Sequence, residues 1–181
     1  MTISEQEEKA PGVQMVASRG EIEGFRQGAR AIDKVLRMNI DGLSQADSLI
    51  QPRPAGNCLN WVVGHLLCVY NHVLPMLEQM PVMKTAALAR YDRGSAPIQD
   101  ASEALQLADL ASKWEEAAAR IDSGLANLAP ETLDAPAPFS PNNDPNETVR
   151  SLLTLVFFHQ AYHAGQTGLL RRMAGKPGAM R

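Results

Sequence analysis

Residues 107–128 carry an apolar side chain at every third or fourth position, and this is the feature that most restricts how the chain can fold. The series is Leu107, Leu110, Trp114, Ala118, Ile121, Leu125 and Leu128. Such spacing gathers the apolar side chains on one face of an α-helix, whereas a half-buried strand needs strict alternation. Asp100 and Glu103 have the spacing of a capping box, so we expect this helix to begin near residue 100.

Three other segments have the same helical spacing. An apolar stripe in the first runs over Ile22, Phe25, Ala29, Ile32, Val35 and Leu36, and Gly42 follows its expected end near residues 38–41. The second is expected to begin after Asn57, a good N-cap, and Pro75 should kink or end it because proline lacks the backbone N–H. We expect the last helix to begin near Asn146 or Glu147 and to stop at Gly175.

These four segments predict an all-α chain that folds as a four-helix bundle. No run of alternating β-branched residues competes with the helical spacing. The stretches 43–56 and 129–145 are rich in proline, so at least one connection is expected to be a long crossover. We expect one bundle domain over residues 19–176, preceded by a flexible arm at 1–18 and followed by a short tail at 177–181.

Composition narrows the classes of function. The chain has 181 residues, of which 45% are hydrophobic, which suits one globular domain and excludes general disorder. A net charge of −3 offers no general attraction to nucleic acid or to anionic lipid. The longest apolar stretch, residues 59–77, contains His65, Asn71, His72 and Pro75, which indicates a buried helix and no membrane span. A polar, acidic start and only two cysteines, Cys58 and Cys68, predict a cytoplasmic protein.

The four histidines carry the clearest chemical signal. His159 and His163 lie four residues apart within the last helix, so their side chains share one face and can reach one metal ion. Apolar residues flank the pair along that face, which points both rings into the bundle, where imidazoles need hydrogen bonds or a metal. Gln160 and Tyr162 stand in place of the glutamate of an H-E-x-x-H protease, so that class is disfavoured.

A third metal ligand is expected from the second helix, which offers His65 and His72. These histidines are seven residues apart, so they share a face but lie roughly 10 Å apart along the helix axis. One ion can use one of them and not both. Their positions along the helix do not decide between them.

The stretch GLSQADSLIQPRPAGNCLNWVVGHLL and the later HQAYHAGQTGLLRR together resemble the DinB superfamily of small helical bundles. The resemblance covers roughly residues 20–174 and implies an up-down-down-up four-helix bundle with a long connection at about residues 81–99. It also implies a three-histidine metal site at His65, His159 and His163, with nickel or zinc as the ion and His72 as the fallback ligand. Some members of the family are metal-dependent transferases or isomerases that use low-molecular-weight thiols.

Three imidazoles leave coordination positions open on a metal, where water or a thiol can bind and lose a proton near neutral pH. Asn60, Cys68 and Tyr162 are candidates for supporting roles around the site, although packing roles suit all three equally well or better. An anionic substrate would need a cationic anchor. The candidates by position are Arg26, Arg30, Arg171 and Arg172, although the last two also suit the negative end of the final helix.

Three hypotheses remain open from the sequence. The first is a metal-dependent enzyme acting on a small molecule, either by thiol transfer or by hydrolysis with metal-bound water. The second is a metal- or ligand-binding protein without catalysis, since neither histidine motif contains a glutamate or aspartate. The third is a structural bundle that acts through dimerisation, and a homodimer is expected because amphipathic helices often leave one apolar face to share.

Overall fold

The computed structural model describes residues 18–179, and the predicted arm at 1–18 lies outside them except for Ser18. Within this part the chain is all-helical and has no strand; Pro136 and Thr148 form one isolated bridge. The helices are α1 (Arg19–Ile40), α2 (Gln45–Ser48), α3 (Leu59–Val73), α4 (Thr85–Leu88), α5 (Leu107–Asn127) and α6 (Val149–Met173). Short 3₁₀ segments cover Leu74–Leu77, Ala89–Tyr91, Ala101–Glu103 and Pro130–Asp134.

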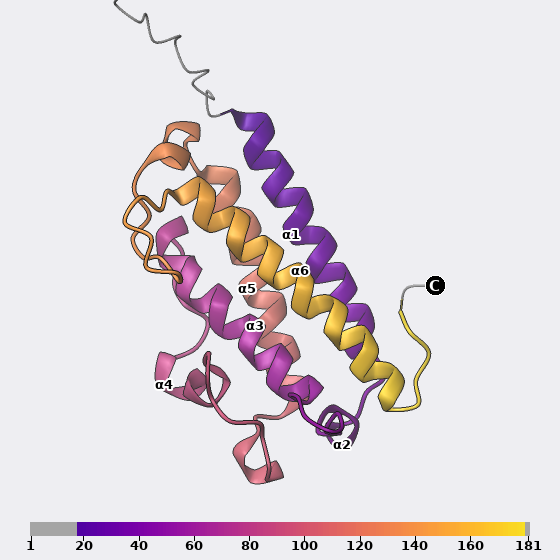
Figure 1. The fold of residues 1–181 in the computed structure, drawn as a ribbon. Helices are drawn as coiled ribbons and strands as arrows, with labels where there is room; N and C mark the ends of the chain where they lie inside the picture. Colours follow the sequence, from indigo (N-terminus) through magenta and orange to yellow (C-terminus); the bar gives the residue numbers. More distant parts are fainter. Residues whose placement is uncertain (1–17, 180–181) are drawn as a thin grey trace, which may run out of the picture.

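Four long helices, α1, α3, α5 and α6, build the body of the molecule (Figure 1). Helix α1 packs against α5 and α6, and α3 packs against the same two helices from the other side. The apolar stripes predicted from spacing face this shared interior, where Leu36, Leu66, Trp114 and Leu152 are fully buried. None of the helices in residues 18–179 is long and apolar enough to cross a membrane.

Two helices begin later than expected, one because of a distant side chain and the other because of a local capping box. Asp100 caps only a short 3₁₀ turn, with its carboxylate accepting from the Ser102 backbone N–H at 2.8 Å. Helix α5 begins at Leu107 instead, where the backbone N–H donates to the side chain of Gln45 in α2 at 2.7 Å. Helix α6 begins at Val149, two or three residues after the expected start, because the adjacent Thr148 and Ser151 form its capping box.

Helix α3 departs from expectation at both ends. Cys58, and not Asn57, is its N-cap residue, and no side chain caps the helix there. At the other end the α-helix stops at Val73 and continues as a 3₁₀ segment that contains Pro75, since proline cannot donate the next helical hydrogen bond. The ends of α1 and α6 agree with expectation, and the glycines that follow them, Gly42 and Gly175, adopt positive φ angles.

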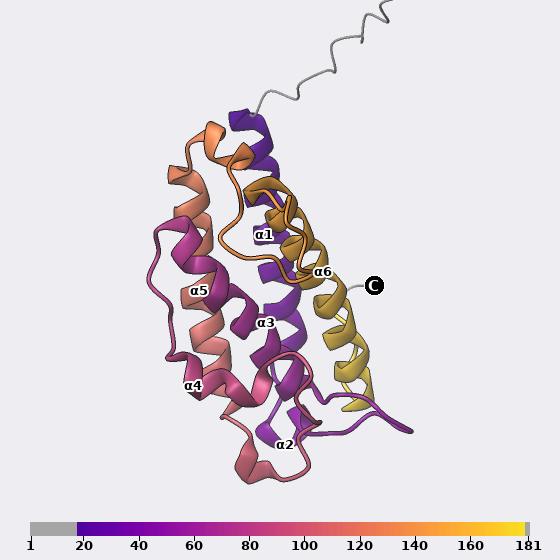
Figure 2. The same ribbon diagram turned by 60° about the vertical axis from the view of Figure 1, so that its left-hand side comes forward.

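Two long connections frame one side of α3. The first leaves α3 after Val73, carries α4 and the 3₁₀ segment Ala89–Tyr91, and returns to α5. The second, between the 3₁₀ segment Pro130–Asp134 and α6, folds back along α6, as the turned view shows (Figure 2). Its two ends are held together by the Ala137 N–H, which donates to the Glu147 carbonyl at 2.8 Å.

Candidate metal centre

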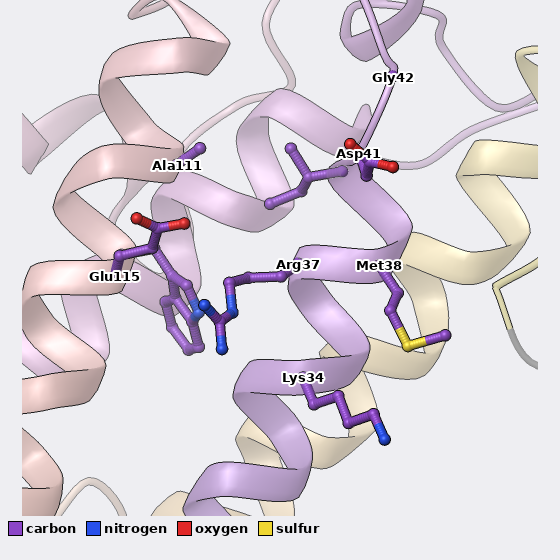
Figure 3. A pocket seen from close by; sticks show the side chains of 9 residues that line it. Lys34, Arg37, Met38, Asp41, Gly42, Ala111 and Glu115 are labelled. Carbon is purple, nitrogen blue, oxygen red and sulfur yellow. The ribbon is translucent and has the colours of Figure 1, made fainter.

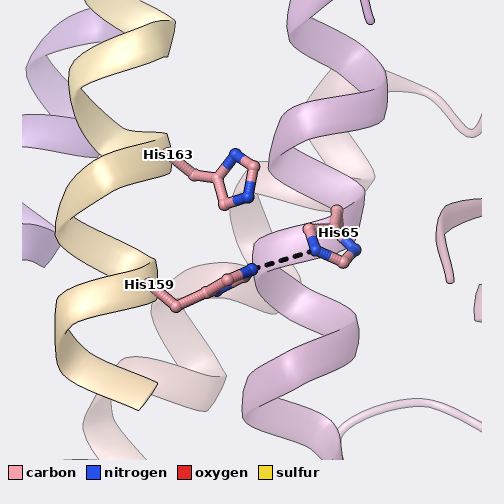
Figure 4. A group of neighbouring side chains, drawn as sticks. All are labelled: His65, His159 and His163. Atoms are coloured by element: carbon pink, nitrogen blue, oxygen red, sulfur yellow. Dashed lines mark hydrogen bonds between the residues drawn. The ribbon is translucent and has the colours of Figure 1, made fainter. Parts of the chain in front are cut away.

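His65 of α3 meets His159 and His163 of α6 at the interface between the two helices (Figure 4). One nitrogen from each ring can be chosen so that all three lie within 4.8 Å of one another. Residues 18–179 contain no other such group of three or more histidine, cysteine or acidic side chains. The i, i+4 spacing places His159 and His163 one turn apart on α6, with ring centroids 4.4 Å apart.

The orientation of the His65 ring is set by a backbone carbonyl. Its Nδ1 lies 2.8 Å from the Tyr91 carbonyl oxygen, which can only accept, so Nδ1 carries the proton and Nε2 keeps a free lone pair. Trp61 stacks on the other side of the imidazole, with centroids 4.8 Å apart. His65 is only 6% exposed, so both contacts hold the ring inside the protein.

Tyr91 is itself held by a buried hydrogen-bond network. Its hydroxyl donates to the Asn60 side-chain oxygen at 2.9 Å and accepts from the Leu105 N–H at 2.7 Å. Asn60 is fully buried and also donates to the Leu105 carbonyl at 2.9 Å. Asn60 therefore supports His65 indirectly, through Tyr91. Tyr91 was not among the residues predicted from the sequence, and Gly64, beside His65, is the one sequence feature that permits such close packing.

The two histidines of α6 differ in their surroundings. His163 donates from Nδ1 to the side-chain oxygen of Gln166, one turn further along the helix, at 2.8 Å. This contact leaves Nε2 of His163 free to bind a ligand, as in His65. His159 Nε2 lies 3.2 Å from His65 Nε2, whereas its buried Nδ1 has no hydrogen-bond partner.

The histidine nitrogens fit a metal ion. Two nitrogens that each lie about 2.0–2.1 Å from one tetrahedral ion are about 3.3 Å apart, close to the 3.2 Å between His65 and His159 Nε2. Imidazole nitrogens are ligands that zinc, nickel, copper and iron accept. The outer contacts of His65 and His163, to a carbonyl and an amide oxygen, are those that commonly orient metal-binding histidines. The three side chains can therefore hold a divalent metal ion.

Electrostatics keep the histidines neutral. Burial is the main cause that lowers the pKa of His65 and of His163, and hydrogen bonding to Tyr91 and Gln166 offsets part of each shift. Burial and then the neighbouring charges of His163 and His65 lower the pKa of His159 to about 4. At pH 7 the three rings are thus neutral, each with one nitrogen free of a proton, which is the form that binds a metal.

A cavity of about 680 Å³ opens beside the three histidines. Its walls come from α3, from residues 92–94, from the 139–142 stretch of the second connection, and from α6. A volume of this size suits a small-molecule ligand. The arrangement therefore places three histidines that can hold a metal ion beside a cavity with room for a small molecule.

The remaining predicted residues take different places. Cys68 lines the cavity, but it is buried and burial raises the pKa of its thiol to about 11, so the thiol stays protonated. His72 also lines the cavity, where its Nδ1 lies 4.0 Å from the Cys68 sulfur, outside the group of three histidines. Tyr162 does not line it; its ring is 60% exposed and touches His163 edge-on.

None of the four arginines considered as anchors lines the cavity. Arg26 and Arg30 both bind Asp122 of α5, at 3.1 and 3.0 Å, and so join α1 to α5. Arg171 donates to the Asn39 carbonyl at 3.1 Å, near the end of α1. Arg172 is exposed in the last turn of α6. The four arginines therefore lie outside the wall of the histidine cavity.

A second hollow of about 580 Å³ lies between α1 and α5 (Figure 3). Its labelled side chains carry both signs of charge, with Lys34 and Arg37 on α1 and Glu115 on α5. Arg37 also forms an ion pair with Asp33 at 2.8 Å. This groove has no converging set of ligand atoms, so the histidine cavity is the better candidate for function.

Comparison with known proteins agrees with these observations. A crystal structure titled as the conserved protein of locus from Enterococcus faecalis superposes with a TM-score of 0.66 at 16% sequence identity. The match covers 85% of this chain and 97% of that one, and at this identity it shows a shared fold. No significant match is found among curated proteins. The family model of the DinB superfamily matches residues 29–167, and the chain therefore belongs to that superfamily.

Proposed function

We propose that this protein is a divalent-metal-dependent enzyme of the DinB superfamily, with a mononuclear centre at His65, His159 and His163. The observation that carries the proposal is the convergence of three neutral imidazoles on one point, with the outer nitrogens of His65 and His163 already hydrogen-bonded. Zinc or nickel suits this donor set. In the same proposal, the four long helices adopt up-down-down-up topology. The common end from which α1 and α6 start supports it (Figure 1).

The proposed reaction is thiol transfer or isomerisation with a small thiol, or hydrolysis. A bound metal would act as a Lewis acid that lowers the pKa of a coordinated thiol or water. The residues of the chain supply the rest. Tyr91 and Gln166 orient two of the imidazoles, and the cavity that the three histidines line gives room for a small molecule.

Elemental analysis of untagged protein tests the metal centre. We expect close to one zinc or nickel ion per chain in the wild type, and a loss of most of it in His65→Ala, His159→Ala and His163→Ala. His72→Ala is the matched control, because His72 lies in the same helix and cavity but outside the converging group. A wild type without metal after reconstitution, or equal loss in His72→Ala, would contradict the proposed site.

A screen of small thiols then tests catalysis. Turnover that needs both the metal and the thiol supports a transferase, whereas metal-dependent hydrolysis without thiol supports the hydrolase. Thiol binding without turnover would favour the binding protein over the enzyme. We also propose a cytoplasmic homodimer. The free thiols Cys58 and Cys68 support the compartment, and the exposed α6 side chains Phe158, Tyr162 and Leu169 support the dimer.

A further inference from the structure

One arginine in the wall of the histidine cavity forms no ion pair within the described residues. Arg93 lines the wall, and within residues 18–179 it has no carboxylate oxygen within 4 Å of its guanidinium. Its single side-chain hydrogen bond goes to the Pro141 carbonyl at 3.2 Å. Six other arginines are ion-paired, namely Arg26, Arg30, Arg37, Arg90, Arg120 and Arg150. A guanidinium has five N–H donors, so most of those on Arg93 remain for a ligand.

Contacts with both long connections hold the Arg93 side chain in the cavity wall. Arg93 follows directly after Tyr91 and Asp92, so the segment whose carbonyl orients His65 also places the guanidinium. The contact with Pro141 ties Arg93 to the second long connection, whose residues form the facing wall. Asp92, which also lines the wall, accepts a hydrogen bond from the Arg93 backbone N–H at 2.7 Å.

The same cavity has a polar atom without a partner. The side-chain oxygen of Asn57 is buried and makes no hydrogen bond, although a buried polar atom is normally paired. Asn57 does not cap α3, as its sequence position suggested, and its amide lies in the cavity wall instead. The oxygen is closed to solvent in this conformation, so a ligand hydroxyl or N–H group would satisfy it once the Asn57 side chain turns toward the cavity.

Apolar side chains complete the wall. Trp61, Val69 and Phe139 line the cavity from α3 and from the second connection. They give a short carbon chain apolar surface to pack against. The cavity wall therefore combines three imidazoles, apolar side chains and one guanidinium.

We propose that this cavity binds a small carboxylate-bearing molecule, with the carboxylate on Arg93 and a second polar group on Asn57, while a donor atom points to the histidines. This inference deepens the proposed function, because it names the chemical class of the ligand at the same site. Arginine is suited to the role since its planar fork binds a carboxylate through two parallel hydrogen bonds. In this proposal Arg93 is the cationic anchor for an anionic ligand, a role for which the sequence had suggested four other arginines.

Three probes of similar size and different charge test the proposal. They are 3-mercaptopropionate, 2-mercaptoethanol and 2-mercaptoethylamine, titrated calorimetrically at pH 7 into zinc-loaded wild type. We expect the carboxylate probe to bind about tenfold more tightly than the neutral one, as for a charge-assisted contact. Arg93→Gln should abolish that preference and Arg93→Lys should keep part of it. Lys34→Gln, in the groove between α1 and α5, is the control and should leave it unchanged.

The outcomes separate this inference from the metal centre. Arg93 is exposed, so Arg93→Gln should keep the wild-type zinc content and melting temperature. Equal affinities for the three probes, tighter binding of the amine, or a preference that survives Arg93→Gln would overturn the inference while zinc content still reports on the histidines. The same titrations in protein treated with EDTA test Arg93 if the wild type holds no metal, because a carboxylate can bind the guanidinium without the ion.

Discussion

The ring of Tyr91 occupies the space in which a side chain at position 64 would stand. A Cβ atom built on Gly64 would lie 2.1 Å from Cδ1 of Tyr91, far inside van der Waals contact. A glycine on a helix lets another segment approach closely, and here that segment is the 3₁₀ segment Ala89–Tyr91. Because the Tyr91 carbonyl binds His65, the absence of a side chain at Gly64 is part of how the imidazole is oriented.

Gly64→Ala should therefore weaken metal binding as well as the fold. The added methyl group must displace the Tyr91 ring, and we expect a loss of about 1–3 kcal/mol in the free energy of unfolding. Disturbing the carbonyl that orients His65 should lower metal affinity by about 10–100-fold. Denaturant unfolding and metal titration measure the two effects. Gly24→Ala in α1 is the control, since open space surrounds it and alanine favours helix. Wild-type metal affinity in Gly64→Ala would contradict this account.

Removing the hydroxyl group should lower the free energy of unfolding at one buried tyrosine, Tyr91, but not at another, Tyr70. Tyr91→Phe leaves the fully buried Asn60 oxygen without its donor, which should cost about 1–3 kcal/mol of unfolding free energy. Tyr70→Phe removes a hydroxyl that has no partner, so stability should stay the same or rise. Thermal or chemical unfolding of the two variants makes the comparison. Similar losses in both would show that the network around Asn60 is not what holds Tyr91.

Acid should destabilise the metal-free protein through His159. The folded-state pKa of about 4 lies below the value of about 6.5 expected for the unfolded chain. Between these values the unfolded chain binds more protons, so the free energy of unfolding should fall as pH drops from about 6.5 to about 4. For one proton the slope is at most about 1.4 kcal/mol per pH unit. Unfolding in EDTA across this range should show a shallower slope in His159→Gln, whereas His72→Gln should keep it.

Trp61 should report metal binding by fluorescence. Its indole stacks on the His65 ring at 4.8 Å, so a nickel or copper ion on that imidazole would quench it strongly. Trp114 stacks on Tyr70 instead and is completely buried. We expect Trp61→Phe to remove most of the quenching seen on titration, whereas Trp114→Phe should retain it. Quenching carried by Trp114 would place the ion elsewhere.

Much of the helical architecture could be predicted from spacing alone. Apolar periodicity identified all four long helices, because a helix with an apolar stripe at 3.6-residue spacing is stabilised when that stripe is buried against other helices. The beginnings of two helices were predicted less well. Asp100 and Glu103 have the spacing of a capping box, but Asp100 caps only a 3₁₀ turn. Helix α5 begins later because its first backbone N–H donates to Gln45, which is 62 residues away. No local pattern contains that information.

The sequence by itself determined the pairing of His159 with His163, because residues four apart on a helix must share a face. Helical spacing did not decide between His65 and His72, which share a face of α3 about 10 Å apart along the axis. The family resemblance pointed to His65, and the docking of α3 on α6 places that histidine level with the pair. Tyr91, Asn57 and Arg93 reached the site through long connections that carry no periodic signal. Their places depend on tertiary contacts, since loops follow the surfaces that the helices present.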